Sequence, residues 1–171
     1  FGYGSFGLEA VLNTADALYY FGFGLPAFAL IKVFSTFFFA NNDTKTPFYI
    51  SLISVILNIL ISVYYFKSIG FIIIPIATTI ASWFNSIVLF IYLKKRNLFQ
   101  FNSIFVVKFF KIVFATITMG IFFKYLILIF ENKMIYDFSF KSFYLILSVL
   151  LCIIFYLLVS FFIKAFNYKD L

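Results

Sequence analysis

The sequence has no histidine, one cysteine and one arginine among its 171 residues. The absence of histidine removes the commonest general base and the commonest metal ligand. The single Cys152 excludes a disulfide within the chain and, inside an apolar run, acts as a small hydrophobic side chain. The sequence also shows no paired carboxylate cluster, glycine-rich phosphate loop or CxxC motif, so hydrolytic or metal chemistry is not indicated.

Charge is scarce as well: 11% of the residues are charged and 65% are hydrophobic. An ordinary soluble domain has about 25% charged and about 45–50% apolar residues. So much apolar surface requires lipid as the solvent, and the composition predicts an integral membrane protein. The net charge of +7 is explained by basic anchors facing anionic lipid, so no nucleic acid partner is needed.

Long apolar runs set the fold class. A spanning helix needs about 20 predominantly apolar residues, and runs of this length without alternation exclude strands. We expect an all-α, polytopic membrane fold with five spanning helices at about residues 13–40, 47–66, 71–93, 104–130 and 140–163. We expect two parts, with the first three helices in 1–100 and the last two in 101–171. Because the chain begins with Phe1 and no signal-peptide pattern precedes the first run, we expect a piece of a longer protein.

The connectors carry helix start and stop signals. The polar run Asn41 to Pro47 separates the first two apolar stretches, with Thr46 and Pro47 as the expected N-cap and first residue of the second helix. In the same loop, Asp43 adds a carboxylate near the positive helix end. Residues 67–70 predict a tight turn before the third helix, and Glu9 suits a short interfacial helix before the first.

Lysine and arginine in the short loops predict the orientation. One side of the membrane carries Lys45, Lys94, Lys95, Arg96, Lys164 and Lys169, and the other carries Lys67, Lys133 and Lys141. The first side is therefore expected to be cytoplasmic, together with the C-terminus.

Polar residues within the apolar runs are the candidates for function, because hydrocarbon offers them no partners. Asn58 and Ser62 in the second helix, with Thr78, Thr79, Ser82 and Asn85 in the third, either join the two helices by hydrogen bonds or line a shared polar pocket. Such a pocket would suit a hard cation such as Na⁺, although neither helix supplies a carboxylate. Lys32 in the first helix either snorkels to the headgroups or faces a wet cavity.

Two stretches resemble the MurJ/MviN family of bacterial lipid II flippases. Tyr19 to Ser51 is similar to the family's tenth and eleventh helices, on the strength of Gly24-Leu25-Pro26-Ala27-Phe28, Lys32-Val33 and the run Asp43-Thr44-Lys45-Thr46-Pro47. "IATTIASWFNSIVLF", Ile76 to Phe90, is similar to the twelfth. The last two apolar runs match the family's final helices by position, length and hydropathy.

The resemblance implies that this chain supplies the last five of about fourteen helices in the bacterial cytoplasmic membrane. The implied substrate is undecaprenyl-pyrophosphate-linked disaccharide-pentapeptide, flipped by alternating access for peptidoglycan synthesis, with no cofactor except possible Na⁺ or membrane-potential coupling. Lys32 becomes a candidate for the substrate cavity, and Asn58, the backbone of Ile74 and Thr78 stand at cation-ligand positions. An acidic ligand of the family is replaced by Ser62, and the pyrophosphate-binding arginines belong to helices that this chain lacks.

Other functions remain open on the residues alone. A flippase for another polyprenyl-pyrophosphate-linked oligosaccharide would share the fold, and only the missing cationic cavity would distinguish it. A membrane enzyme is disfavoured by the lack of histidine and of buried carboxylates. A scaffold subunit would not need Asn58, Thr78 and Lys32 at membrane depth.

Overall fold

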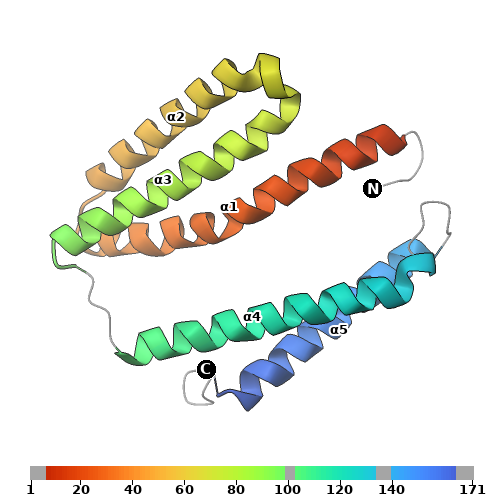
Figure 1. Ribbon diagram of the computed structural model, residues 1–171. Helices are drawn as coiled ribbons and strands as arrows, with labels where there is room; N and C mark the ends of the chain where they lie inside the picture. Colours follow the sequence, from red (N-terminus) through yellow and green to blue (C-terminus); the bar gives the residue numbers. More distant parts are fainter. Residues whose placement is uncertain (1–6, 99–102, 134–139, 165–171) are drawn as a thin grey trace. The chain divides into compact units, whose positions relative to one another are not determined.

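The computed structural model describes residues 7–98, 103–133 and 140–164, nearly all of them helical (Figure 1). Within these ranges the elements are α1 (Leu8–Ala40), α2 (Lys45–Ile69), η1 (Gly70–Ile72), α3 (Ile73–Lys95), α4 (Ser103–Phe130), η2 (Glu131–Lys133) and α5 (Lys141–Phe162), where η marks a 3₁₀ turn. No strand occurs in the described residues. The prediction of an all-α, polytopic membrane fold is confirmed.

The number of apolar helical segments long enough to cross a membrane is four in the described residues, not five. They are Glu9–Ala40, Lys45–Lys95, Val106–Phe130 and Lys141–Phe162. The difference arises because α2, η1 and α3 form one continuous helical segment of 51 residues. Straight, it would be about 75 Å long, against a hydrocarbon core of about 30 Å. The segment instead reverses at η1, so that α2 and α3 lie side by side (Figure 1).

Two predicted boundaries are wrong. Helix α1 begins at Leu8, so Glu9 lies in its first turn rather than in a separate interfacial helix. Helix α2 continues to Ile69, so the expected turn at residues 67–70 is helical up to its last residue. The chain changes direction at Gly70, which has a φ of 75° and donates its N–H to the carbonyl of Phe66. Glycine adopts this positive φ without the steric cost that a side chain would add, which is why the helix ends there.

The chain divides into two compact units, Phe1–Gln100 and Phe101–Leu171. In the first unit α3 packs against both α1 and α2, whereas α1 and α2 touch each other little. At the end near the α1–α2 connection, an apolar core holds the three helices together. Its buried members come from all three: Phe34, Phe38, Ile50, Leu89 and Leu93.

Helices α1 and α3 cross closely where α1 carries Gly24 and Pro26. Proline inside a helix removes one backbone hydrogen bond and bends the helix, and Figure 1 shows α1 changing direction near its middle. On α3, the Thr79 hydroxyl donates to the carbonyl of Tyr20 at 2.8 Å and the Trp83 indole donates to the carbonyl of Phe23 at 3.0 Å. The bent stretch of α1 is therefore fixed to α3 by directional bonds.

The second unit is a hairpin of α4 and α5. Small side chains on α5 at intervals of four and eight residues, Ser148, Cys152 and Ser160, are buried, as is Ala115 of α4. Small residues let helix backbones approach closely in lipid, where no hydrophobic force drives helices together. Farther along, the rings of Phe122 and Phe155 stack with centroids 4.3 Å apart.

Candidate functional site

A polar groove of about 300 Å³ lies in the first unit, where α2 faces α3 and α1 forms one edge. Its polar lining consists of Ser51, Ser54 and Asn58 from α2 and Thr78, Ser82 and Asn85 from α3. Within each helix these residues follow at intervals of three or four, which places them on one helical face. Apolar Phe28, Ile31, Val55 and Ala81 complete the lining. We call this feature the α2–α3 groove.

At one end of the groove, three of the predicted site residues lie together. The Asn58 amide donates from Nδ2 to Thr78 Oγ1 at 3.3 Å, and the Thr78 hydroxyl donates to the carbonyl of Ile74 at 2.8 Å. Ser62 donates its hydroxyl to Asn58 Oδ1 at 3.2 Å. The oxygens that these bonds bring together, from the Asn58 amide, the Thr78 hydroxyl and the Ile74 carbonyl, are all neutral. The described residues contain no group of three or more histidine, cysteine, aspartate or glutamate side chains that could hold a metal ion. Cation binding by Asn58, Ile74 and Thr78 stays a prediction.

At the other end of the groove, hydrogen bonding is incomplete. Asn85 donates from Nδ2 to Ser51 Oγ at 3.3 Å, while Ser54 and Ser82 donate to carbonyls of their own helices, Ile50 and Thr78, at 2.9 and 2.7 Å. Asn85 is 6% exposed, and its buried Oδ1 accepts no hydrogen bond from the described residues. Sequence reasoning missed Ser51 and Ser54, although the seven-residue spacing from Ser51 to Asn58 was a usable signal.

Lys32 is not brought into the groove. It lies exposed on α1, beside Ile31, which does line the groove. It follows Phe28 by four residues, so the two side chains share one side of α1. Its assignment to the substrate cavity stays a prediction.

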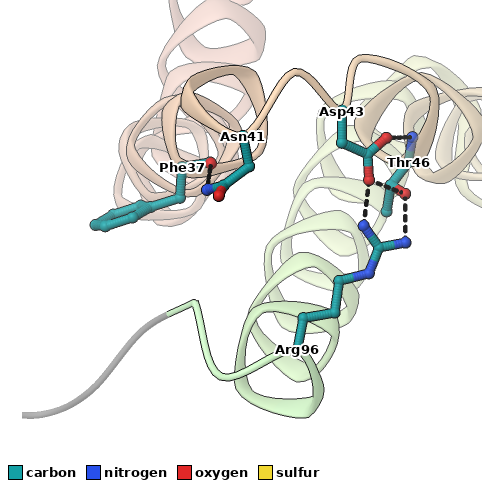
Figure 2. Close-up of polar contacts among 5 residues, drawn as sticks. All are labelled: Phe37, Asn41, Asp43, Thr46 and Arg96. Atoms are coloured by element: carbon teal, nitrogen blue, oxygen red, sulfur yellow. Dashed lines mark hydrogen bonds and ion pairs between the residues drawn. The ribbon is translucent and has the colours of Figure 1, made fainter.

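The connection between α1 and α2 forms a second polar cluster, shown in Figure 2. Asp43 accepts a bond from the Thr46 backbone N–H at 3.0 Å and another from the Thr46 hydroxyl at 2.7 Å. The Arg96 guanidinium, at the end of α3, pairs with Asp43 and donates to Thr46 Oγ1 at 3.2 Å. In the same view, Asn41 donates from its amide to the carbonyl of Phe37 at 2.8 Å, turning back onto α1.

This cluster corrects the predicted helix start. Helix α2 begins at Lys45, and the residue whose side chain caps it is Asp43, not Thr46. Both residue types suit a cap, but the Asp43 carboxylate satisfies a free N–H and also faces the positive helix end. Pro47 is buried within the first turn, where its missing N–H costs nothing, and Thr44 is the exposed residue just before the helix.

The environment of Asp43 favours its ionised form. The Thr46 hydroxyl and then the Thr46 N–H, with a smaller contribution from Arg96, lower the pKa of Asp43 from 3.8 to about 2. Arg96 is 53 positions along the chain from its partner, which no local pattern could have indicated. The cluster thus joins the α1–α2 connection to the end of α3.

Comparison with known proteins points in one direction. A family model described as lipid II flippase MurJ matches residues 1–147. A probable lipid II flippase MurJ of Rickettsia prowazekii is 40% identical over 94 residues, covering 55% of this chain and 18% of that protein. One from Buchnera aphidicola subsp. Schizaphis graminum is 27% identical over 175 aligned positions, covering 99% and 34%. One from Borreliella burgdorferi is 30% identical over 166 residues, covering 96% and 32%.

The chain therefore spans about a fifth to a third of the length of these relatives. The family match itself extends over most of the chain, from the bent α1 through the groove and into α5. On that match, the chain belongs to the MurJ lipid II flippase family.

Proposed function

We propose that the whole protein moves lipid II from the inner to the outer leaflet of the bacterial cytoplasmic membrane. Lipid II here means undecaprenyl-pyrophosphate-linked disaccharide-pentapeptide, used for cell-wall synthesis. The observation that carries the proposal is the family match over residues 1–147. The activity is transport by alternating access rather than catalysis, and it belongs to the full-length protein, of which this chain is a part.

Each unit would contribute differently. The first unit offers polar groups at membrane depth, which join helices by hydrogen bonds and also suit the lining of a transport pathway. The second unit offers long apolar faces on α4 and α5, with exposed side chains such as Ile117, Leu128 and Leu157, which suit a long isoprenoid tail. The excess of basic residues in the α1–α2 and α3–α4 connections and in the tail supports a cytoplasmic position for those segments and for the C-terminus.

Depletion of the full-length protein tests the proposal. Lipid II should continue to be synthesised and should accumulate, while the fraction accessible to a membrane-impermeant lipid II-cleaving enzyme added outside falls with the protein level. Re-expression of the protein should restore that fraction. Normal external lipid II after depletion would refute the proposal, and loss of a different polyprenyl-linked oligosaccharide from the outer leaflet would identify a sister flippase instead.

A further inference from the structure

Helix α1 is packed unevenly along its length. Within residues 24–40, Gly24, Ala27, Phe34 and Phe38 are buried, and the two phenylalanines belong to the apolar core of the first unit. Within residues 9–23, no residue is buried in this unit. Close packing is what fixes one helix to another in lipid, so residues 24–40 are anchored in the unit and the residues before them are not. We call residues 24–40 the anchored half of α1 and residues 8–23 its arm.

The border between these two parts contains three residues that weaken a helix. Pro26 has no N–H, so the carbonyl of Gly22 loses the hydrogen bond that a regular helix would give it. Gly22 and Gly24 add backbone freedom, because glycine favours a helix less than any residue except proline. Sharp kinks in helices occur mostly at proline, and Figure 1 shows α1 changing direction near its middle. The backbone of α1 is therefore easiest to bend at residues 22–26.

Two hydrogen bonds from α3 hold the arm next to this bend. The Thr79 hydroxyl donates to the carbonyl of Tyr20 at 2.8 Å, and the Trp83 indole donates to the carbonyl of Phe23 at 3.0 Å. Both acceptors lie in the last turn of the arm. A hydrogen bond between helices in lipid shifts an equilibrium by only about threefold on average. These two bonds can therefore open while the apolar core stays packed.

We propose that α1 is a hinged helix, in which the arm swings about residues 22–26 and the bonds from Thr79 and Trp83 form its latch. In the latched position the arm lies against α3, as in Figure 1. In the released position both bonds are open and the anchored half keeps its place in the apolar core. The hinge does not depend on which substrate the whole protein carries.

Distances between pairs of spin labels in the full-length protein, measured by double electron–electron resonance, test the hinge. With Cys152 and any other native cysteines replaced, the arm pair joins Leu12→Cys to Ile91→Cys on α3. The matched anchored pair joins Phe39→Cys to Ile80→Cys on α3. All four positions are 46–58% exposed in this unit. We expect two distance populations for the arm pair and one for the anchored pair, because only the arm moves relative to α3.

Substitutions in the latch and in the hinge should change the arm pair alone. Thr79→Val and Trp83→Phe each delete one donor and keep an apolar side chain, so each should raise the ratio of released to latched arm about threefold. Together they should raise it about eightfold. Pro26→Ala returns the missing N–H, so it should reduce the arm pair to a single population. The distance of the anchored pair should stay the same in all of these variants.

A second arm position keeps the test decisive if the first label impairs folding. Glu9→Cys, which is exposed nearer the start of the arm, then takes the place of Leu12→Cys. A single arm distance that Thr79→Val and Trp83→Phe leave unchanged would overturn the proposal. Two populations in the anchored pair would also overturn it, because α1 would then move as a whole. Neither result depends on whether the protein moves lipid II.

Discussion

The crossing of α1 and α3 allows a sharp test of how the first unit is held together. Gly24 is buried at the crossing, and a Cβ added to it would lie 3.0 Å from Thr79 Oγ1 and 3.2 Å from Phe28 Cε2. Gly22, two residues earlier in the same helix, is exposed, and a Cβ there would meet nothing within 4 Å. Gly24→Ala and Gly22→Ala are therefore a matched pair.

The difference between the two variants isolates the steric cost. Both gain helix propensity of about 1 kcal/mol on replacing glycine by alanine. In Gly24→Ala the Phe28 ring can turn away, but Thr79 is held by its 2.8 Å bond to the carbonyl of Tyr20. Either that bond breaks, at about 0.6 kcal/mol for an interhelical bond in lipid, or the helices separate, at about 1–3 kcal/mol for overpacking. Because the protein takes the cheaper of the two routes, we expect Gly24→Ala to be less stable than Gly22→Ala by about 0.6 kcal/mol, and by no more than about 3 kcal/mol.

The assay is the free energy of unfolding of the purified full-length protein, with each alanine variant made alone and combined with Thr79→Ala. Removing the hydroxyl removes the nearest atom of the clash, so most of the penalty of Gly24→Ala should disappear in the double variant. Equal stabilities of the Gly24→Ala and Gly22→Ala proteins would refute the close crossing. A penalty that persists undiminished with Thr79→Ala would show that Thr79 is not its cause.

Three further predictions concern the predicted site residues. Thr46→Val should raise the pKa of Asp43 from about 2 towards 3.8 by more than Arg96→Gln does, because the Thr46 hydroxyl is the larger cause; carboxyl titration by NMR measures both. The pKa of Asp43 is lower in the folded protein than in the unfolded chain, so its ionised carboxylate stabilises the fold above about pH 4. That stability is lost as the pH falls through about 2. A free energy of unfolding that does not change between about pH 4 and about pH 2 would contradict this. If flipping depends on Na⁺, Asn58→Ala should weaken that dependence in the full-length protein, whereas an unaltered Na⁺ response would exclude Asn58 from the cation site.

Features that depend on the average composition of many residues, such as the membrane class and the helical fold, were predicted correctly from the sequence. Membrane class and helical fold follow from apolar runs of about 20 residues, over which local exceptions cancel. The pairing of Asn58 with Thr78 was also within reach, because a polar side chain in the middle of an apolar helix must find a partner on a neighbouring helix.

What the sequence could not predict depends on single contacts. Asp43 and Thr46 are both good helix caps, and the choice between them is fixed by the hydrogen bonds of Asp43 and by Arg96 on another helix. The end of α2 was placed too early because Lys67 and Ser68 suit a turn as well as a helix, and only Gly70 has the positive φ that the reversal needs. The half-buried Ser51 and buried Ser54 looked like ordinary small residues until α3 was placed beside them.

The position of α3 explains why a groove exists in the first unit at all. Helices in lipid gain nothing from hydrophobic association, so they must be joined by close packing and hydrogen bonds. Helix α3 supplies both, through Thr79 and Trp83 to α1 and through Thr78 and Asn85 to α2. Because α1 and α2 are each fixed to α3 and little to one another, the gap between them is not closed by packing. The same polar contacts that hold α2 against α3 also supply the lining of the groove, so replacing Asn58 or Asn85 by an apolar residue should both change that lining and loosen α2.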